Sequence, residues 1–398
     1  MKIYRITSGI LGFSCGILVF ALGLVLLGAF YSSFFHGEFS EISNDTIEFS
    51  FAAPAVLKGS GFPPVLAYWI SGHKGDNEKI LRLLKAVYHP RNQYLLSLDA
   101  SSSDYERSKL ALSVQSEMIF RAFGNVNVVG RSYPLNLMGS SALAATLHAA
   151  SLLLRINRDW DWYIPLSASD YPIMSQDDLL HAFTFLPRDL NFIDYSTNSG
   201  WKKRQGINHI AMDPNLYFKE NTQIFFASEV RATPDAFQIY GGSPWFILSR
   251  AFMDYCVHGW DNLPRKLLMY FTNVAYPLES YFHTVLCNSP EFQNTSANND
   301  LRFIEWNNPS DMETNFLNLS HYKRMVLSGS VFARPFQEGN LLLQKVDEII
   351  LKRRPDGFVP GKWCLDTGMN QTMEISNSDI NEEEPSSIWG DINAVKPG

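Results

Sequence analysis

A single carboxylate, Glu279, stands in an otherwise aromatic and aliphatic stretch, Tyr-Pro-Leu-Glu-Ser-Tyr-Phe-His-Thr-Val-Leu-Cys, at residues 276–287. The residues that follow it have the apolar character of a buried run. Burial disfavours the charged form of a carboxylic acid, so the pKa of Glu279 is expected to be raised. A glutamate with a raised pKa can act as a general base near neutral pH. Glu279 is therefore the first catalytic candidate.

The region that starts at residue 65 alternates between apolar strands and amphipathic helices. Predicted strands cover residues 65–71, 93–98, 126–129 and 162–167, and predicted helices cover residues 77–88, 105–123, 140–155 and 250–258. This alternation predicts an α/β fold with a mostly parallel sheet and helices on both faces. Ligands of such sheets bind at the carboxyl ends of the strands. His73 follows the first strand and Asp99 ends the second, so we expect both side chains to face the ligand crevice.

Segment 276–287 closely resembles the catalytic-base segment of glycosyltransferase family 14, the Golgi branching enzymes. That family includes core-2/I N-acetylglucosaminyltransferases, protein xylosyltransferases and plant β-glucuronosyltransferases. The segments Leu-Ser-Ala-Ser-Asp-Tyr-Pro at 166–172 and Trp-Asp-Asn-Leu-Pro-Arg at 260–265 are similar to the plant subset, and the resemblance runs from about residue 65 to 364. The resemblance implies a GT-A-like fold and an inverting transfer of glucuronic acid from UDP-glucuronate to galactan chains of arabinogalactan proteins, with Glu279 as the base.

The resemblance also implies where the donor nucleotide binds. In the family, the strands that match the first two predicted here hold the uracil and the ribose, which makes Tyr68, His73 and Asp99 nucleotide contacts. The residues alone leave a second interpretation open. Asp99 would then cap the turn Ser-Ser-Ser-Asp that follows it, and His73 would be an ordinary surface residue.

Many nucleotide-sugar transferases use an Asp-X-Asp motif to bind a divalent ion, because carboxylate oxygens suit Mn²⁺ or Mg²⁺. The chain contains Asp159-Trp160-Asp161, but these acids precede the strand at 162–167 and so lie at its amino end. Only Asp170 lies at the carboxyl end, where we expect it to form a turn before Pro172. The branching family has the same arrangement and works without a metal, so we expect no metal and no other cofactor.

Without a metal, basic side chains must neutralise the leaving diphosphate. Lys323, Arg324 and Arg334 are available near the carboxyl end of the domain, and we expect Arg324 and Arg334 to bind the nucleotide sugar. Plant relatives usually read Phe-Ala-Arg-Lys-Phe where this chain reads Phe-Ala-Arg-Pro-Phe, so Pro335 replaces the family's diphosphate-binding lysine. Three interpretations follow. Arg334 takes over the role of the lysine, or the donor site is weakened, or these cations are ordinary solvated charges.

Two further motifs resemble the family's acceptor site. Trp201, Lys202, Lys203 and Arg204 match a loop that approaches the accepting sugar, in which an aromatic face can stack on sugar C–H groups. The loop could equally be an exposed basic surface. Trp245, in Gly-Ser-Pro-Trp at 242–245, resembles the acceptor wall of the family.

The amino terminus contains an uncharged apolar run at residues 9–31. About 20 apolar residues span a bilayer. Lys2 and Arg5 precede the run and four acids follow it within residues 35–51, so the amino terminus is expected in the cytosol and the rest in the lumen. The alternative is a cleaved signal peptide, for which the run is long. We therefore expect a single-pass type II protein of the Golgi membrane with a cytosolic tail (1–8), an anchor (9–31), a stem (32–64), a lumenal GT-A-like domain (65–367) and a mobile tail (368–398).

Four Asn-X-Ser/Thr triplets fit lumenal exposure, and they lie at Asn44, Asn294, Asn318 and Asn370. Each triplet alone is a weak signal. Three cysteines follow the apolar run, Cys256, Cys287 and Cys364. An odd number in an oxidising compartment allows one disulfide and one free thiol, or a bridge to another chain. The sequence leaves the pairing open.

Composition limits the remaining function classes. The formal net charge is −7 and 18% of residues are charged, without a basic cluster long enough to follow a nucleic-acid backbone. Nucleic acid is therefore not expected as a partner. Two rivals to glucuronic acid transfer stay open, namely transfer of N-acetylglucosamine or xylose from another UDP-sugar, and an inactive relative that binds sugars or scaffolds other Golgi enzymes.

Overall fold

The computed structural model describes residues 57, 59, 61–196, 206–218, 222–306 and 314–362. The chain divides into two compact units, residues 1–52 and 53–398, and all described residues belong to the second. Within this described part, no helix is both long and apolar enough to cross a membrane. The predicted anchor at 9–31 and the predicted tail at 368–398 lie outside the described residues.

A seven-stranded sheet forms the centre of the domain, in the order β10-β6-β9-β4-β1-β2-β3. Four neighbours are mutually parallel, as predicted: β1 (Leu66–Gly72), β2 (Gln93–Leu98), β3 (Val126–Val128) and β4 (Trp162–Ser167). β9 (Gly241–Ser249) is antiparallel to β4 and to β6 (Asn191–Ser196), which pairs in parallel with β10 (Ser296–Ala297). The carboxyl ends of the four parallel strands therefore share one edge of the sheet.

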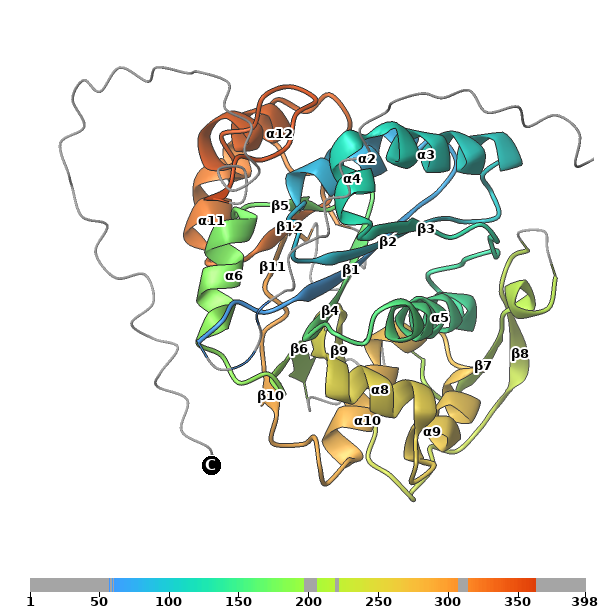
Figure 1. Ribbon diagram of the computed structural model, residues 1–398. Coiled ribbons are helices and arrows are strands. Elements are labelled where there is room, and N and C mark those ends of the chain that lie inside the picture. Colours follow the sequence, from blue (N-terminus) through green and yellow to red (C-terminus); the bar gives the residue numbers. More distant parts are fainter. Residues whose placement is uncertain are drawn as a thin grey trace, which may run out of the picture. The chain divides into compact units, whose positions relative to one another are not determined.

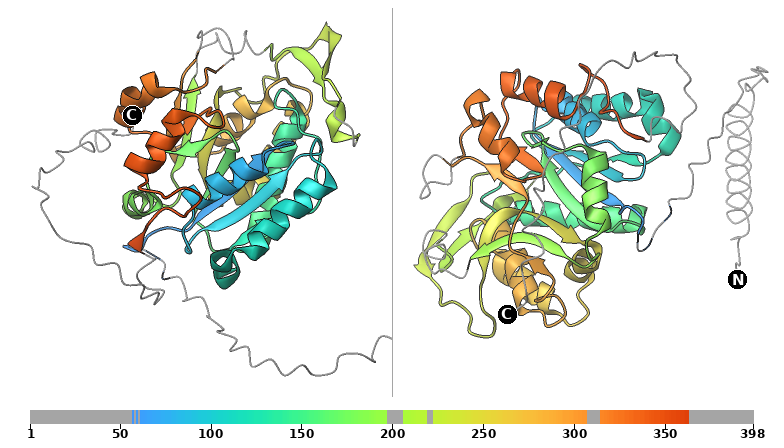
Figure 2. Two further views of the ribbon diagram at one scale, coloured as in Figure 1. Left: turned by 90° about the horizontal axis from the view of Figure 1, so that it is seen from above. Right: turned by 90° about the vertical axis from the view of Figure 1, so that its left-hand side faces the viewer.

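Helices cover both faces of this sheet (Figures 1 and 2). One face carries α2 (Asn77–Ala86), α3 (Asp104–Ser116), α4 (Met118–Phe123), α6 (Gln176–Thr184), α11 (Tyr322–Leu327) and α12 (Leu341–Lys345). The other carries α5 (Ser140–Ile156), α8 (Arg250–His258), α9 (Leu263–Phe271) and α10 (Tyr281–Asn288). The prediction of one helix at 105–123 is wrong, because Glu117 has extended backbone angles, φ −76° and ψ 115°, and separates α3 from α4.

Alternation along β1 divides its side chains between two hydrophobic cores. Leu66, Tyr68 and Ile70 pack in the core beneath α2 and α3, whereas Ala67 and Trp69 pack in the core beneath α5. A shift of one position therefore moves a side chain to the opposite face of the sheet.

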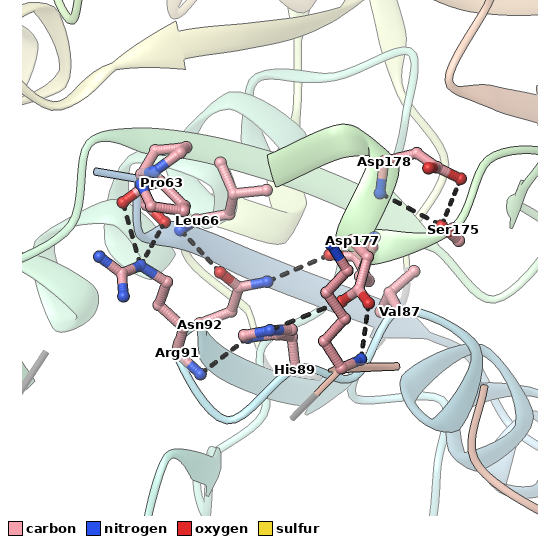
Figure 3. A network of polar contacts seen from close by, with 12 residues as sticks. Pro63, Leu66, Val87, His89, Arg91, Asn92, Ser175, Asp177 and Asp178 are labelled. Atoms are coloured by element: carbon pink, nitrogen blue, oxygen red, sulfur yellow. Dashed lines mark hydrogen bonds and ion pairs between the residues drawn. The ribbon is translucent and has the colours of Figure 1, made fainter. Parts of the chain in front are cut away.

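Polar contacts fix the amino edge of the sheet (Figure 3). The backbone N–H of Leu66 donates to Asn92 Oδ1 at 3.1 Å, and Asn92 Nδ2 donates to Gln176 Oε1 at 3.1 Å, which ties β1 to the start of α6. Nearby, burial lowers the pKa of His89 to about 4, although the charge of Asp177 opposes the shift. His89 is therefore neutral at physiological pH.

Two smaller sheets flank the main one. β5 (Tyr171–Pro172), β12 (Phe332–Arg334) and β11 (Arg302–Ile304) form a three-stranded sheet directly after the end of β4. β7 (His209–Met212) and β8 (Phe225–Val230) form a ribbon. Short helical turns complete the described chain: η1 (Pro214–Leu216), η2 (Pro277–Glu279), η3 (Leu319–His321) and η4 (Val346–Ile350). The three-stranded sheet brings β12, from late in the chain, to the carboxyl end of β4.

Candidate active site

A cavity of about 210 Å³ opens at the carboxyl edge of the main sheet. Its lining comes from the ends of β1, β2 and β4, from the segment after β3, and from α5. His73, Asp99, Trp245 from β9 and Arg334 from β12 are among the lining residues. The structure therefore brings four of the predicted site residues together in the crevice where the parallel strands end.

His73 and Asp99 form a direct contact. His73 Nδ1 lies 2.7 Å from Asp99 Oδ2, and the backbone N–H of Ser101 donates to Asp99 Oδ1 at 3.0 Å. The hydrogen bond to Asp99 raises the pKa of His73 against the effect of burial. Burial works to raise the pKa of Asp99, but the hydrogen bonds from His73 and Ser101 outweigh it and lower that pKa. Asp99 therefore closes the turn that follows β2 and also lines the cavity.

Tyr68 does not line the cavity. Its side chain is fully buried on the α2 face of the sheet, where its ring stacks on Tyr94 and its hydroxyl donates to Gln176 Oε1 at 2.8 Å. The enclosed ring offers no atom to a ligand in the cavity, so the placement of Tyr68 does not support the predicted nucleotide contact. The next residue, Trp69, faces the cavity, and its indole N–H donates to Ser97 Oγ at 2.8 Å.

Asp170 lies between two arginines at the end of β4. Its Oδ1 is 3.4 Å from Arg334 Nε, and its Oδ2 is 3.8 Å from Arg302 Nη1. Asp170 Oδ2 also accepts a hydrogen bond of 2.6 Å from the backbone N–H of Ser167, which is the predicted turn. The second role of Asp170, which is to oppose the charge of two guanidinium groups, was not predicted from the sequence.

Trp245 connects this charge cluster to the cavity. The Arg334 guanidinium carbon lies 3.5 Å from the centroid of the Trp245 ring, and the Arg302 guanidinium carbon lies 5.4 Å from it. Both distances are within the range of cation–π attraction. The Trp245 ring therefore contacts the Arg334 guanidinium at the cavity wall.

Glu279 ends η2, directly before α10. The backbone N–H of Glu279 donates to Tyr276 O at 3.0 Å, and the backbone N–H of Tyr276 donates to Met138 O at 2.7 Å, next to the start of α5. Leu278 lines the cavity, whereas Glu279, the next residue in the chain, is half-buried and is not among the lining residues. Burial, and then the charge of Glu279, raise the pKa of Tyr276. The raised pKa predicted for Glu279 itself stays a prediction.

Arg324 lies away from the cavity lining. Its side chain is 62% exposed on α11 and pairs with Glu305. An arginine in solvent with its own counter-ion is an ordinary surface charge, which was one of the alternatives for this segment. Arg324 therefore does not line the cavity, whereas Arg334 does, and the predicted contact of Arg334 with the donor stays a prediction.

Several predicted sites fall on residues outside the described part of the chain. These are the acceptor residues Trp201, Lys202 and Arg204, the glycosylation sites Asn44 and Asn370, and Cys364. Asn294 and Asn318 are both exposed, as a glycosylation site requires. Cys256 is buried and Cys287 partly buried, and both are free thiols.

The acids of the Asp-X-Asp motif lie where the sequence predicted. Asp161 Oδ2 accepts a hydrogen bond of 2.8 Å from the backbone N–H of Val65, at the amino edge of the sheet and opposite the cavity. Among the described residues, no group of three or more His, Cys, Asp and Glu side chains is placed to hold a metal ion. Metal independence itself stays a prediction.

Two cations of the site were not predicted from the sequence. Arg131 lines the cavity after β3, and the strand-end rule that selected Asp99 would have selected it as well. Arg302 begins β11 and precedes two apolar residues, and the residue as a whole is 7% exposed. A cation on the buried face of a strand is rare without a partner, and that pattern was the available signal.

Comparison with known proteins identifies the family. The family model described as Core-2/I-branching enzyme matches residues 66–326. The chain is 42% identical over 366 residues to β-glucuronosyltransferase GlcAT14A of Arabidopsis thaliana, covering 87% of this chain and 79% of that protein. It is 46% identical over 295 residues to β-glucuronosyltransferase GlcAT14C of the same plant, covering 74% of this chain and 76% of that protein. It is 31% identical over 248 residues to human xylosyltransferase 1, covering 62% and 24%.

Among solved structures, the apo structure of the bifunctional glycosyltransferase WbbM matches 72% of this chain and 48% of its own, with a TM-score of 0.36 and 12% identity. The family assignment does not depend on this weak likeness. The parallel half-sheet with its cavity at the carboxyl edge is a GT-A-like α/β arrangement. With the family model matching well over half of its length, the chain belongs to the Core-2/I-branching glycosyltransferases.

Proposed function

We propose that this protein transfers glucuronic acid from UDP-glucuronate to the galactan chains of arabinogalactan proteins, with inversion at the anomeric carbon. The identity of 42–46% to proteins named β-glucuronosyltransferases supports this donor over the xylose donor of the more distant xylosyltransferases. We further propose that it acts in the Golgi lumen, anchored by residues 9–31, which form an uncharged apolar run.

A cluster of two arginines and one carboxylate, of which Arg334 lines the cavity, is the observation that carries the proposal. Arg334 and Arg302 share one carboxylate, Asp170, and Arg334 lines the cavity. A departing UDP develops negative charge on its diphosphate, and fixed guanidinium groups stabilise such charge without reorganisation. Guanidinium also binds phosphate oxygens in a bidentate manner. This arrangement suits a transferase that releases a nucleoside diphosphate without a metal ion.

Glu279 supplies the base in this mechanism. Its carboxylate takes the proton of the acceptor hydroxyl while that oxygen attacks the anomeric carbon of the donor. The bond from that carbon to the diphosphate oxygen breaks on the opposite face, and the electron pair leaves with UDP. UDP is stable as an anion and needs no proton, so one carboxylate suffices.

Pro335 is the reason that a catalytically inactive relative is retained as the alternative. Its side chain is buried, and its carbonyl accepts a hydrogen bond of 3.0 Å from the backbone N–H of Leu317. The position of the family's lysine is therefore occupied by a packed residue, and Arg334, one residue earlier, is a cation that lines the cavity. This geometry favours a working donor site built on Arg334 over a decayed one.

The experiment is incubation of the purified protein with a β-galactan acceptor and each of UDP-glucuronate, UDP-N-acetylglucosamine and UDP-xylose. We expect transfer from UDP-glucuronate with inversion. Faster transfer from another donor would show that glucuronic acid is not the transferred sugar. Absence of transfer from all three, together with intact UDP binding, would favour the sugar-binding alternative. Glu291→Gln, at an exposed position, serves as a control for Glu279→Gln.

A further inference from the structure

We infer that Arg302 is a positioning residue that shares the negative charge of Asp170, so that Arg334 keeps its positive charge for the donor diphosphate. The inference rests on the proposed function, because it assumes that Arg334 faces a nucleoside diphosphate. It assigns a role to a residue that does not itself reach the ligand.

The Arg302 side chain is held entirely inside the protein. The exposed fraction of this side chain is 0%, and its Nη2 donates to Pro165 O, in β4, at 2.7 Å. The guanidinium carbon lies 5.1 Å from the centroid of the Phe332 ring, on β12, and also faces Trp245. Arg302 therefore touches the strand that ends at the cavity, the strand that carries Arg334 and the ring on which Arg334 lies.

The cost of burying Arg302 indicates a specific role. Moving a guanidinium out of water is unfavourable unless it is paired and hydrogen-bonded. Arg302 reaches its carboxylate partner only at 3.8 Å, and its Nε and Nη1 atoms have no hydrogen-bond acceptor among the described residues. Simple support of the fold would be met better by an apolar side chain between Trp245 and Phe332.

Electrostatics links the two arginines through Asp170. Burial lowers the pKa of the Arg334 guanidinium, the charge of Asp170 raises it, and the charge of Arg302 lowers it. The charge of Asp300 raises the pKa of Arg302 but does not contribute to the shift of Arg334. Asp300 Oδ2 accepts a hydrogen bond of 2.6 Å from Ser243 Oγ. Asp170 and Arg302 are thus the charged groups that act on the Arg334 guanidinium most directly.

The hydrogen-bonding capacity of this cluster is also incomplete. Asp170 Oδ1 and the Nε and Nη1 atoms of Arg334 are buried without a hydrogen-bond partner among the described residues. Buried polar groups are normally paired, and unpaired ones mark strain or a missing ligand. Three facts therefore agree: a net charge of about +1 from two guanidinium groups and one carboxylate, unpaired donors and an adjacent cavity.

The charge count gives a test that separates this role from packing. Loss of the Arg302 charge leaves Asp170 and Arg334 as a neutral pair, and the site loses its attraction for an anion. Removing the Asp170 charge as well leaves Arg334 alone and restores a net charge of about +1. The Asp170 substitution should therefore restore the UDP affinity that the Arg302 substitution lowers. If both substitutions acted only through packing, their effects on UDP affinity would add.

The experiment is a calorimetric titration of UDP against the full-length protein and four variants. These are Arg302→Met, Asp170→Asn, the double variant Asp170→Asn/Arg302→Met, and Arg121→Met as an exposed control on α4. Thermal unfolding of each variant is measured in parallel. Arg302→Lys is added because it keeps the charge and alters the packing.

We expect Arg302→Met to weaken UDP binding on the order of tenfold, because opposite charges separated by roughly 10 Å at an effective dielectric of about 20 attract by about that factor. The double variant should recover most of that loss. Asp170→Asn should bind UDP more tightly than the wild type, because it raises the net charge of the cluster to about +2. Arg302→Lys, which keeps the charge, should bind UDP about as well as the wild type. A double variant weaker than Arg302→Met, or folded Arg302→Met with wild-type affinity, would overturn the inference. If Arg334→Ala also leaves UDP binding unchanged, the proposed donor site itself is wrong, and the two failures are thereby distinguished.

Discussion

Arg334→Ala is expected to weaken UDP binding and to raise the KM for the UDP-sugar. The Arg334 side chain is 13% exposed, so solvent screens its charge only weakly, and it faces the cavity from the surface of Trp245. A charge-assisted hydrogen bond contributes about 1.5–3 kcal/mol. At about 1.4 kcal/mol for each factor of ten, UDP affinity should fall roughly 10- to 150-fold.

Isothermal titration of UDP measures this loss directly, and two further variants show its cause. Arg334→Lys retains the charge but not the planar fork, so its affinity should lie between those of the wild type and Arg334→Ala. Pro335→Lys should improve UDP binding little, because Pro335 is buried and lies outside the cavity lining. A folded Arg334→Ala protein with wild-type UDP affinity would remove Arg334 from the site. Tenfold tighter binding in Pro335→Lys would show instead that the proline has weakened the donor site.

Three other predictions test separate parts of the site. Treatment with EDTA should leave transfer unchanged, and loss of activity that Mn²⁺ restores would contradict the expected metal independence. Tyr68→Phe should lower the free energy of unfolding by about 1 kcal/mol through loss of its hydrogen bond to Gln176, with UDP affinity unchanged; a tenfold loss of affinity would return Tyr68 to the donor site. The pKa of His73 is raised, so the stabilisation from its contact with Asp99 is complete below about pH 6.5 and is lost as the pH rises through that raised pKa. The pKa of Asp99 is lowered, so its contribution to stability is lost only at strongly acid pH. His73→Gln should flatten the dependence of the unfolding temperature on pH above about 6.5, and an unchanged profile would mean that the contact contributes nothing measurable.

Local patterns in the sequence were sufficient to predict the parallel half of the sheet. The strands at 93–98 and 162–167 and the helix at 250–258 have the bounds of β2, β4 and α8. Apolar runs of strand length separated by helical spacing carry that information locally. The antiparallel β9 was not predicted as a strand, because its pairing with β4 and β6 depends on contacts between distant segments.

The site could be predicted where it depended on strand ends and could not where it depended on side-chain direction or distant pairing. His73 and Asp99 followed from the rule that ligands bind at carboxyl ends. Tyr68 was misplaced by one step of strand alternation, which exchanges the two faces of a sheet. The partnership of Asp170 with Arg302 and Arg334 joins residues more than 130 positions apart, and no local pattern reports it.

Glucuronic acid transfer by the wild type and by Glu279→Gln, with UDP-glucuronate and a β-galactan acceptor, is the most direct measurement of the proposed activity. We expect the wild type to form a β-linked product, and Glu279→Gln to lower turnover roughly 10²- to 10⁴-fold because the amide cannot accept the proton. UDP affinity should be nearly equal in the two proteins, and Glu291→Gln should transfer at the wild-type rate. Turnover in Glu279→Gln above about a tenth of the wild-type value, or no transfer from UDP-glucuronate by the wild type, would contradict the proposed reaction.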